Sequence, residues 1–291
     1  MKIEANGPPG EGSEKDHHWQ MGVEIVQAQR KASLKLKLKI ALVWVALFFL
    51  IFLALLQLDF KPRYVLEHYD FVLAGALTTI GVSLASIAIA TVLALFGALG
   101  RLSKNAIAQG ITGAYVSLIR GTPLLIQIYL IYLGLPQIGQ QLIDHGYITV
   151  GRMFTLSAIQ SGILALSLNY GAYMTEIFRA GIQSIGFGQR EAAQAIGMSP
   201  WQTMKRVILP QAIRIIIPDI GNQFIAMQKD SALVSVMGIW EITYRANRLA
   251  RKDARFMEMF ILAGLMYWIL TIISSYLEER LERRMAHAYE R

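Results

Sequence analysis

The sequence contains no cysteine among its 291 residues. This absence excludes a disulfide framework, a cysteine-ligated metal site and a thiolate nucleophile. Charged residues are also scarce, at 16%, whereas hydrophobic residues make up 54% of the chain. Together with a mean hydropathy of +0.42, this composition lies outside the range of soluble globular domains and predicts a membrane protein that crosses the bilayer several times.

The sequence also lacks the usual signatures of catalysis. It has no Gly-x-x-x-x-Gly-Lys-Ser/Thr loop, so the chain cannot hold ATP in that way. Its five histidines show no metal-ligand spacing, which argues against a membrane-embedded enzyme: they are His17, His18, His68, His145 and His287. The formal net charge is +8, but the basic residues mostly flank apolar segments instead of forming one stripe. Membrane topology therefore accounts for them better than a nucleic-acid partner.

Long apolar runs predict about six transmembrane helices. The first run, Ile40–Leu58, has 19 uncharged residues, close to the ~20 that a bilayer core requires. A signal peptide is the alternative, but the run is long for one and no small-x-small cleavage site follows. Residues 1–39 are expected to form a mobile basic arm on the cytoplasmic side. The other spans are expected near 71–100, 120–135, 154–177, 207–227 and 256–277, with the fifth bent or broken by Pro210 and Pro218.

The distribution of Lys and Arg predicts the orientation of these spans. Six spans with both termini inside place the basic segments 30–39, 101–104, 179–206 and 280–291 in the cytoplasm, as the positive-inside rule requires. One segment disagrees with the rule, because 245–255 carries five basic residues and would lie outside. We therefore expect this segment to be partly docked on the protein.

One polar stretch reads as a capped helical hairpin. Gln189–Ile196 is rich in helix formers, and Gly197 follows where a left-handed residue ends a helix. Ser199 then reads as the N-cap of a second helix, with Pro200 at its first position and Gln202 completing a capping box. Ala192, Ala193 and Ala195 leave the first helix without bulk, so that it could lie in a groove on another protein. An ordinary cytoplasmic loop is the alternative.

The hairpin and four further motifs resemble one family. Glu191-Ala192-Ala193, Gly197 four residues after Ala193, and Leu209-Pro210 match the EAA motif of ATP-binding cassette (ABC) importer permeases. The other motifs are Arg120-Gly121-Thr122-Pro123-Leu124-Leu125, Asn169-Tyr170-Gly171-Ala172-Tyr173, Glu176-Ile177-Phe178-Arg179-Ala180-Gly181-Ile182 and Gly188-Gln189-Arg190. Over about residues 71–285 the chain resembles bacterial permease subunits for polar amino acid uptake. The resemblance implies an all-α fold with a five-helix core, to which residues 40–58 add one N-terminal transmembrane helix.

The resemblance also implies a function and a set of partners. The chain is expected to be a non-catalytic permease subunit in the bacterial cytoplasmic (inner) membrane that moves polar amino acids by alternating access. Two ABC ATPase subunits would bind ATP and Mg, which this chain itself would not bind. A second permease subunit and an extracytoplasmic amino-acid-binding protein would complete the complex, and membrane lipid would surround the transmembrane helices. A permease for another small solute, or an ion-coupled secondary transporter, remains the alternative.

The expected site residues form two groups. Coupling to the ATPase is expected from a hairpin at about residues 186–206, through Gln189, Glu191, Ala192, Ala193, Gly197, Ser199 and Pro200. The substrate path is expected at Lys229, Asp230, Ser231, Asn169, Tyr173, Arg120 and Thr122. In this path Asp230 would pair with a cationic group of the ligand, unless Lys229 and Asp230 simply pair with each other. Arg120 could instead be a positive-inside anchor, and Glu176 could be neutralised by Arg179 three residues later.

Overall fold

The computed structural model describes residues 14–57, 59–149 and 154–287, and within these ranges the chain is all-helical. It divides into two units, residues 1–61 and 62–291. Each unit is described separately below.

The first unit consists of a single long helix, α1 (Glu14–Gln57). Its C-terminal half is the uncharged run that begins at Ile40, and the segment Gln29–Gln57 is long and apolar enough to cross a membrane. Residues 14–39 of the segment expected to be an arm are helical, and α1 is continuous because no proline interrupts residues 14–57. The basic segment 30–39 is therefore helical and continuous with the apolar run. Residues 1–13 of the expected arm, and Leu58, lie outside the described residues.

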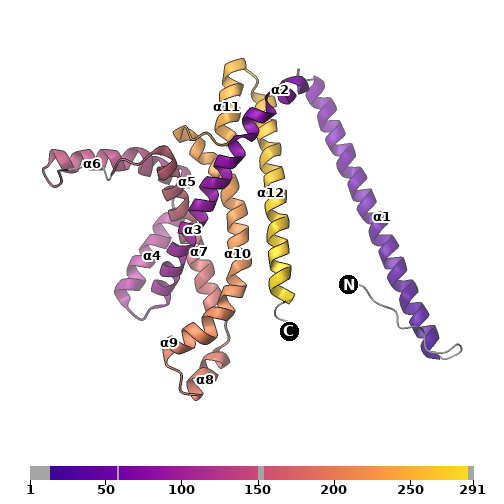
Figure 1. Cartoon of the computed structure of the whole chain (residues 1–291), viewed down its shortest axis with the longest axis horizontal. Helices are drawn as coiled ribbons and strands as arrows, with labels where there is room; N and C mark the ends of the chain where they lie inside the picture. The colour runs from indigo at the N-terminus through magenta and orange to yellow at the C-terminus, as the bar shows by residue number, and fades with distance from the viewer. Residues whose placement is uncertain (1–13, 58, 150–153, 288–291) are drawn as a thin grey trace. The chain divides into compact units, whose positions relative to one another are not determined.

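The second unit is a bundle built around α3 (Gly75–Leu102), which follows the short helix α2 (Pro62–Leu73). Helix α7 (Ala158–Gln183) packs along α3, and α10 (Leu209–Asp230) lies against both of them and against α12 (Phe256–His287) (Figure 1). Most residues of the larger apolar core come from α3, α7 and α10, and others come from α5 and the segments that flank α10.

Small residues allow α3 and α7 to approach closely. Ala90, Ala94 and Ala98 of α3 are fully buried. Gly97 lies so near the side chain of Thr175 that a β-carbon would collide with it. The Ser167 hydroxyl of α7 donates to the Ser86 carbonyl of α3 at 3.2 Å. Close backbones and hydroxyl hydrogen bonds are how helices associate where lipid supplies no hydrophobic driving force.

The third predicted span, 120–135, falls on a helical stretch that begins after Pro123 and runs to Asp144, but the helix before it was not predicted. Residues Ala106–Arg120 form a helix of their own, α4, whose N-cap Asn105 accepts hydrogen bonds from Ile107 and Ala108. The chain then breaks at 121–123 and continues as α5 (Leu124–Tyr129), a π-helical turn η1 (Leu130–Gly134) and α6 (Leu135–Asp144). The two parts are bent by 107°. Pro123 explains the break, since it lacks an N–H and disfavours a helical conformation of the residue before it.

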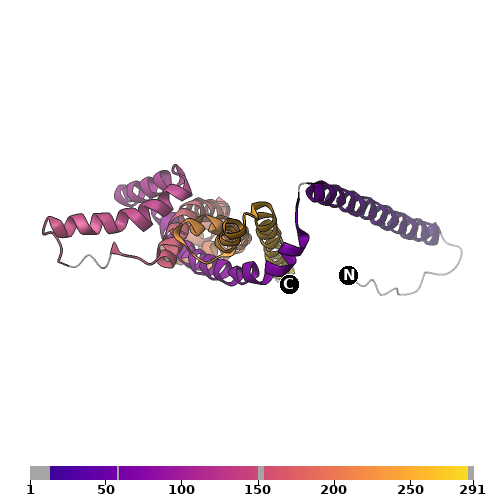
Figure 2. The same cartoon turned by 90° about the horizontal axis from the view of Figure 1, so that it is seen from above.

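The bend directs α6 away from the bundle of α3, α7 and α10, as the view from above shows (Figure 2). By length and composition, three described segments can cross a membrane, and a fourth is counted if the bent pair forms one span. Helices α7 and α10 are not among them, because Asn169, Glu176, Arg214 and Asp219 lower their hydropathy. Both nevertheless lie alongside α3 in the same bundle.

The two ends of this unit differ in what they carry (Figure 1). At one end lie α8 (Phe187–Ala195), α9 (Pro200–Thr203), the π-helical turn η3 (Met204–Ile208), the turn between α3 and α4, and the C-terminal end of α12. The opposite end carries α2 and α11 (Ile242–Asp253), which follows the 3₁₀ helix η4 (Ser231–Met237). Basic segments 101–104 and 179–206 thus share an end, as the positive-inside rule requires, whereas segment 245–255 lies at the other end and remains the exception to that rule. Helix α10 is not broken at Pro218, and the irregular turn η3 lies directly before Leu209 and Pro210, the first residues of α10.

Segment 245–255 is docked on the protein, as the sequence predicts. The apolar face of α11, including Ile242, Ala246 and Leu249, is buried against α2 and α12. The N-cap of α11 is the fully buried Glu241, which accepts from the N–H groups of Thr243 and Tyr244 and from the Tyr267 hydroxyl. Burial raises the pKa of the Glu241 carboxyl, and these hydrogen bonds act in the opposite direction.

The contact between α3 and this cap leads to a stability prediction. A β-carbon on Gly75 would lie 2.6 Å from the Ile242 nitrogen and 2.7 Å from the Glu241 carbonyl carbon, and these backbone atoms cannot rotate away. We expect Gly75→Ala to lower the melting temperature of the purified protein by about 3 to 10 °C, because overpacking a core costs ~1–3 kcal/mol. Gly81→Ala on the same helix is the control, since nothing lies within 4 Å of its β-carbon. Equal melting temperatures for the two variants would contradict the prediction.

Candidate functional site: a rigid hairpin and a polar cavity

The hairpin has the local structure that its sequence predicts. Gly197 has φ +78°, its N–H donates to the Gln194 carbonyl, and the Met198 N–H donates to the Ala193 carbonyl. This pair of bonds is a Schellman motif, which ends α8. The Ser199 hydroxyl accepts from the Gln202 N–H while the Gln202 side chain accepts from the Ser199 N–H. Both helix ends at the turn are therefore satisfied, and the hairpin is held in one shape.

The hairpin exposes large apolar side chains, two of them beside its turn and one at the start of α8. Phe187 and Ile196 are each 74% exposed, and Trp201 is 69% exposed. Among the expected coupling residues, Gln189, Glu191, Ala192, Gly197, Ser199 and Pro200 are exposed, whereas Ala193 is buried. An exposed apolar cluster beside small alanines is typical of a surface that another protein covers.

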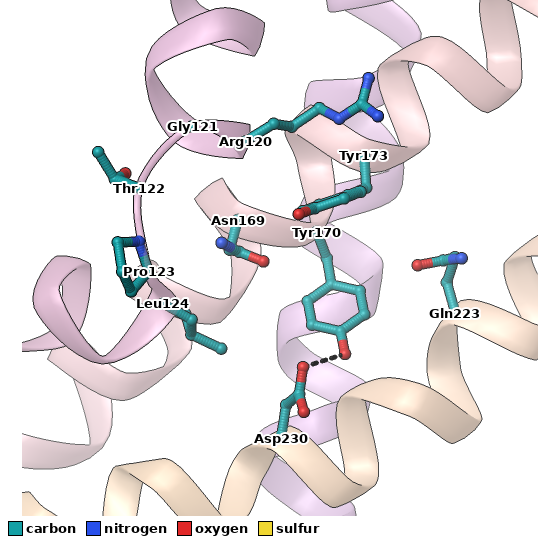
Figure 3. Close-up of a pocket in the computed structure, with 10 residues that line it drawn as sticks. All are labelled: Arg120, Gly121, Thr122, Pro123, Leu124, Asn169, Tyr170, Tyr173, Gln223 and Asp230. Carbon is teal, nitrogen blue, oxygen red and sulfur yellow. Dashed lines mark hydrogen bonds between the residues drawn. The ribbon is translucent and has the colours of Figure 1, made fainter.

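A polar cavity of about 510 Å³ lies where the break between α4 and α5 faces α7 and α10. Figure 3 shows its lining. Five of the seven expected substrate-path residues line it, namely Arg120, Thr122, Asn169, Tyr173 and Asp230. Tyr170 and Gln223 also line it, together with Gly121, Pro123 and Leu124.

Hydrogen bonds hold the polar groups of this cavity in place. The Tyr170 hydroxyl donates to Asp230 Oδ2 at 2.8 Å, so α7 fixes the carboxylate at the end of α10 (Figure 3). The Asn169 amide donates to Gln127 Oε1 at 3.1 Å, and Gln127 donates to the Thr122 hydroxyl at 2.9 Å. Gln127 also donates to the Ile119 carbonyl, which the helix break leaves without an intrahelical partner. The break is thereby stabilised by side chains that lie beside the cavity.

Arg120 is part of the cavity and not of the basic turn at residues 101–104. Its guanidinium lies over the Tyr173 ring, 5.0 Å from the ring centre. Helix α4 separates it from that turn by 15 residues, about 22 Å of helix. A positive-inside anchor would lie next to the turn, so this position favours a role in the cavity.

A second cavity of about 560 Å³ shares Arg120, Tyr173 and Gln223 with the first and adds Glu176 and Asp219. Here Glu176 is paired, with Oε2 2.8 Å from Arg179 Nε and Oε1 3.3 Å from Arg101 Nε. The expected pair of Glu176 with Arg179 is therefore present, and it also ties α7 to the end of α3.

Two expected residues lie elsewhere. Lys229 is exposed and does not line either cavity, because it stands about 100° around α10 from Asp230. The Ser231 hydroxyl is buried and donates to the Gln228 carbonyl at 2.7 Å. The sequence analysis missed Tyr170 and Gln223. Gln223 lies seven residues before Asp230, and that helical spacing could have indicated it.

Among the described residues no cluster of His, Cys, Asp and Glu could hold a metal ion.

Comparisons with known proteins give the family. Residues 90–287 match the model of the binding-protein-dependent transport system inner membrane component. The chain is 33% identical to the probable amino-acid ABC transporter permease YckA of Bacillus subtilis, over 78% of this chain and 95% of that one. It is 34% identical to the arginine transport system permease ArtQ of the same organism, over 79% and 98%. The chain belongs to the family of amino acid ABC transporter permeases.

A solved structure supports the same assignment. The crystal structure of an amino acid ABC transporter with histidines has a chain that is 34% identical, with a TM-score of 0.68 over 77% of this chain and 99% of that one. This permease is therefore a non-catalytic transport subunit and a multi-pass membrane protein. The family model begins at residue 90, so α1 lies outside the residues that it matches.

Proposed function

We propose that this permease subunit imports polar amino acids through six transmembrane helices, five in the core and α1 in addition. Alternating access is driven by two ABC ATPase subunits that bind ATP and Mg. The observation that carries the proposal is the rigid, apolar-tipped hairpin of α8 and α9, at the same end as the basic turn 101–104, in a chain that lacks an ATP-binding loop of its own.

The hairpin acts as the coupling element at about residues 186–206. Its exposed Ile196 and Trp201 supply an apolar contact for a groove of the ATPase, and Ala192 allows close approach. Glu191 lies in the middle of α8 with its side chain exposed, where a polar partner group can reach it. Because its turn is fixed on both sides, movement of the ATPase is transmitted to α7 and α10 as a rigid displacement.

The polar cavity acts as the substrate path. A free amino acid carries an ammonium and a carboxylate, and the cavity offers Asp230 for the first and Arg120 for the second. Asn169, Thr122 and Tyr173 add hydrogen-bonding groups. Polar groups at membrane depth are costly unless they face a cavity or one another, so their concentration here supports a path for a polar solute. Lys229 and Ser231 shape the end of α10 from outside the cavity.

The complex tests this function directly. The purified chain is assembled with its second permease subunit and the ATPase subunits and is reconstituted in vesicles. The extracytoplasmic amino-acid-binding protein is added on the side opposite the ATPase subunits, as in the inner membrane. We expect ATP-dependent uptake that depends on the binding protein and on one class of polar amino acid. Uptake driven by an ion gradient without ATPase subunits would establish the secondary transporter instead. If the vesicles took up another small solute and no amino acid, the chain would be a permease for that solute class.

The basic surface of α11 gives a prediction for the binding protein. Arg245 is stacked on Phe71 and Trp240 and Arg255 is paired with Glu258, but Arg251 and Lys252 are exposed at the end opposite the hairpin. We expect this surface to dock an acidic patch of the binding protein. Lys252→Glu should raise the concentration of binding protein needed for half-maximal ATPase stimulation about fivefold at low salt, with a smaller effect at high salt. Lys104→Glu, the same change at the other end, should leave that concentration unaltered, and equal effects of the two would exclude the surface.

A further inference from the structure

Helix α1 carries a concentrated positive charge that the transport mechanism does not use. Five cations precede the apolar run within ten residues: Arg30, Lys31, Lys35, Lys37 and Lys39. Between Ile25 and Leu58 there is no Asp or Glu. All five side chains are exposed, and none has an ion-pair partner among the residues that the structure describes. The charge of this segment is therefore not neutralised within the described unit.

The five cations surround the helix instead of following one face. At about 100° per residue, Arg30 and Lys37 fall on one side of α1, and Lys31, Lys35 and Lys39 fall toward the other. Leu34, Leu36 and Leu38 are interspersed among them. A helix that lies flat on a membrane keeps its cations on one face and its apolar residues on the opposite face. This arrangement instead suits a helix that passes through the headgroup region with lipid on all sides.

The position of the cations along α1 matches that region. Lys39 directly precedes the apolar run, and Ile40–Gln57 is about 27 Å of helix, close to the ~30 Å thickness of the hydrocarbon core. Lys35 lies about 6 Å further out than Lys39, within the headgroup layer, and Arg30 lies about 14 Å out. Lysine stems can lie along the neighbouring leucines while the ammonium groups reach the phosphates.

We propose that residues 30–39 of α1 form a collar that binds the headgroups of anionic phospholipids. The ligand is recognised by the net negative charge of its headgroup, whereas in a zwitterionic headgroup an ammonium group neutralises the phosphate. In the orientation proposed above, the collar faces the cytoplasmic leaflet, whose anionic lipids attract a juxtamembrane basic segment. The collar lies outside the residues that the family model matches, and it would anchor the chain independently of substrate or ATP.

Lipid binding to the purified full-length chain tests the collar. The protein is mixed in non-ionic detergent with equal amounts of phosphatidylglycerol and phosphatidylcholine, and bound lipids are counted by native mass spectrometry. We expect the wild-type chain to prefer phosphatidylglycerol. Lys37→Gln/Lys39→Gln should lower this preference about 25-fold, since each cation near an anionic surface accounts for roughly a fivefold factor.

The matched control is Arg280→Gln/Arg284→Gln, which removes two exposed cations from the end of α12, where Glu279 and Glu282 are interspersed. We expect its lipid preference to stay within twofold of wild type, with helix content and melting temperature checked for both variants. No preference in the wild type, or equal losses in the two variants, would overturn the proposal. The proposal would also be overturned if Lys37→Gln/Lys39→Gln kept the lipid preference of wild type but co-purified less ATPase. That result would mean that the collar binds the ATPase and not lipid. The binding assay contains no ATP, substrate or partner, so its failure leaves the transport function untouched.

Discussion

Replacing Gly197 with valine is expected to lower ATP-driven amino acid uptake about thirtyfold. Gly197 has φ +78°, and a side chain in the left-handed region costs roughly 2 kcal/mol for most residues, more for a β-branched one. The Schellman bonds to Ala193 and Gln194 depend on this conformation. The variant must therefore deform the turn, which displaces α8 relative to α9 and separates the apolar side chains that would enter the ATPase together. Uptake in reconstituted vesicles and co-purification of the ATPase measure the effect.

Gly186→Val is the matched control for this experiment. Gly186 is the N-cap of α8 with φ −52°, and a β-carbon at either glycine meets nothing within 4 Å. The two variants therefore add the same side chain to the same hairpin, and only one of them requires a left-handed residue. We expect the Gly186 variant to retain uptake within about fivefold of wild type, because replacing a glycine N-cap by valine costs about 0.5–1 kcal/mol. If both variants transport equally well, the fixed turn is not needed for coupling.

The hairpin turn could be predicted from the sequence because its determinants are local. Gly197, Ser199 and Gln202 act on backbone groups within four residues, so neighbouring letters are sufficient. Helix α4 shows the opposite case. Gln109 and the glycines at 110 and 113 interrupt its apolar run, so a search for long apolar segments passes over it, and the 107° bend follows only once the chain is folded.

The cavity could be predicted only in part for a related reason. Asn169 and Tyr173 share a face of one helix, which their spacing of four indicates. Contacts between helices carry no such period, so nothing near Asp230 in the sequence indicates that Tyr170, sixty residues away, donates to it. Lys229 was expected in the substrate path together with its neighbour Asp230, and the helical turn of α10 places the two side chains on different faces. The sequence therefore predicts which segment lines the cavity, but the direction in which each side chain points from the helix decides which residue of that segment faces it.

Because Asp230 lines the cavity and its neighbour Lys229 does not, replacing each of them in turn tests the cavity as the substrate path. Asp230→Asn preserves the size of the side chain and can still accept the Tyr170 hydroxyl, but it removes the charge. A carboxylate has about four lone-pair sites and the Tyr170 bond occupies one, so capacity remains for an ammonium group. A hydrogen bond to a charged group contributes about 1.5–3 kcal/mol, and we expect uptake of the amino acid to fall about a hundredfold. Substrate-dependent ATPase stimulation should fall with it.

Lys229→Gln is the control that tells loss of a charge inside the cavity from loss of a charge beside it. It also removes one charge, at the adjacent position, but its side chain is exposed and does not line either cavity. We expect uptake by this variant within about threefold of wild type, with melting temperatures measured for both proteins to exclude unfolding. A large loss in Lys229→Gln with normal uptake in Asp230→Asn would reverse the assignment. It would mean that the substrate contacts α10 on the face that the lysine occupies, about 100° from the cavity.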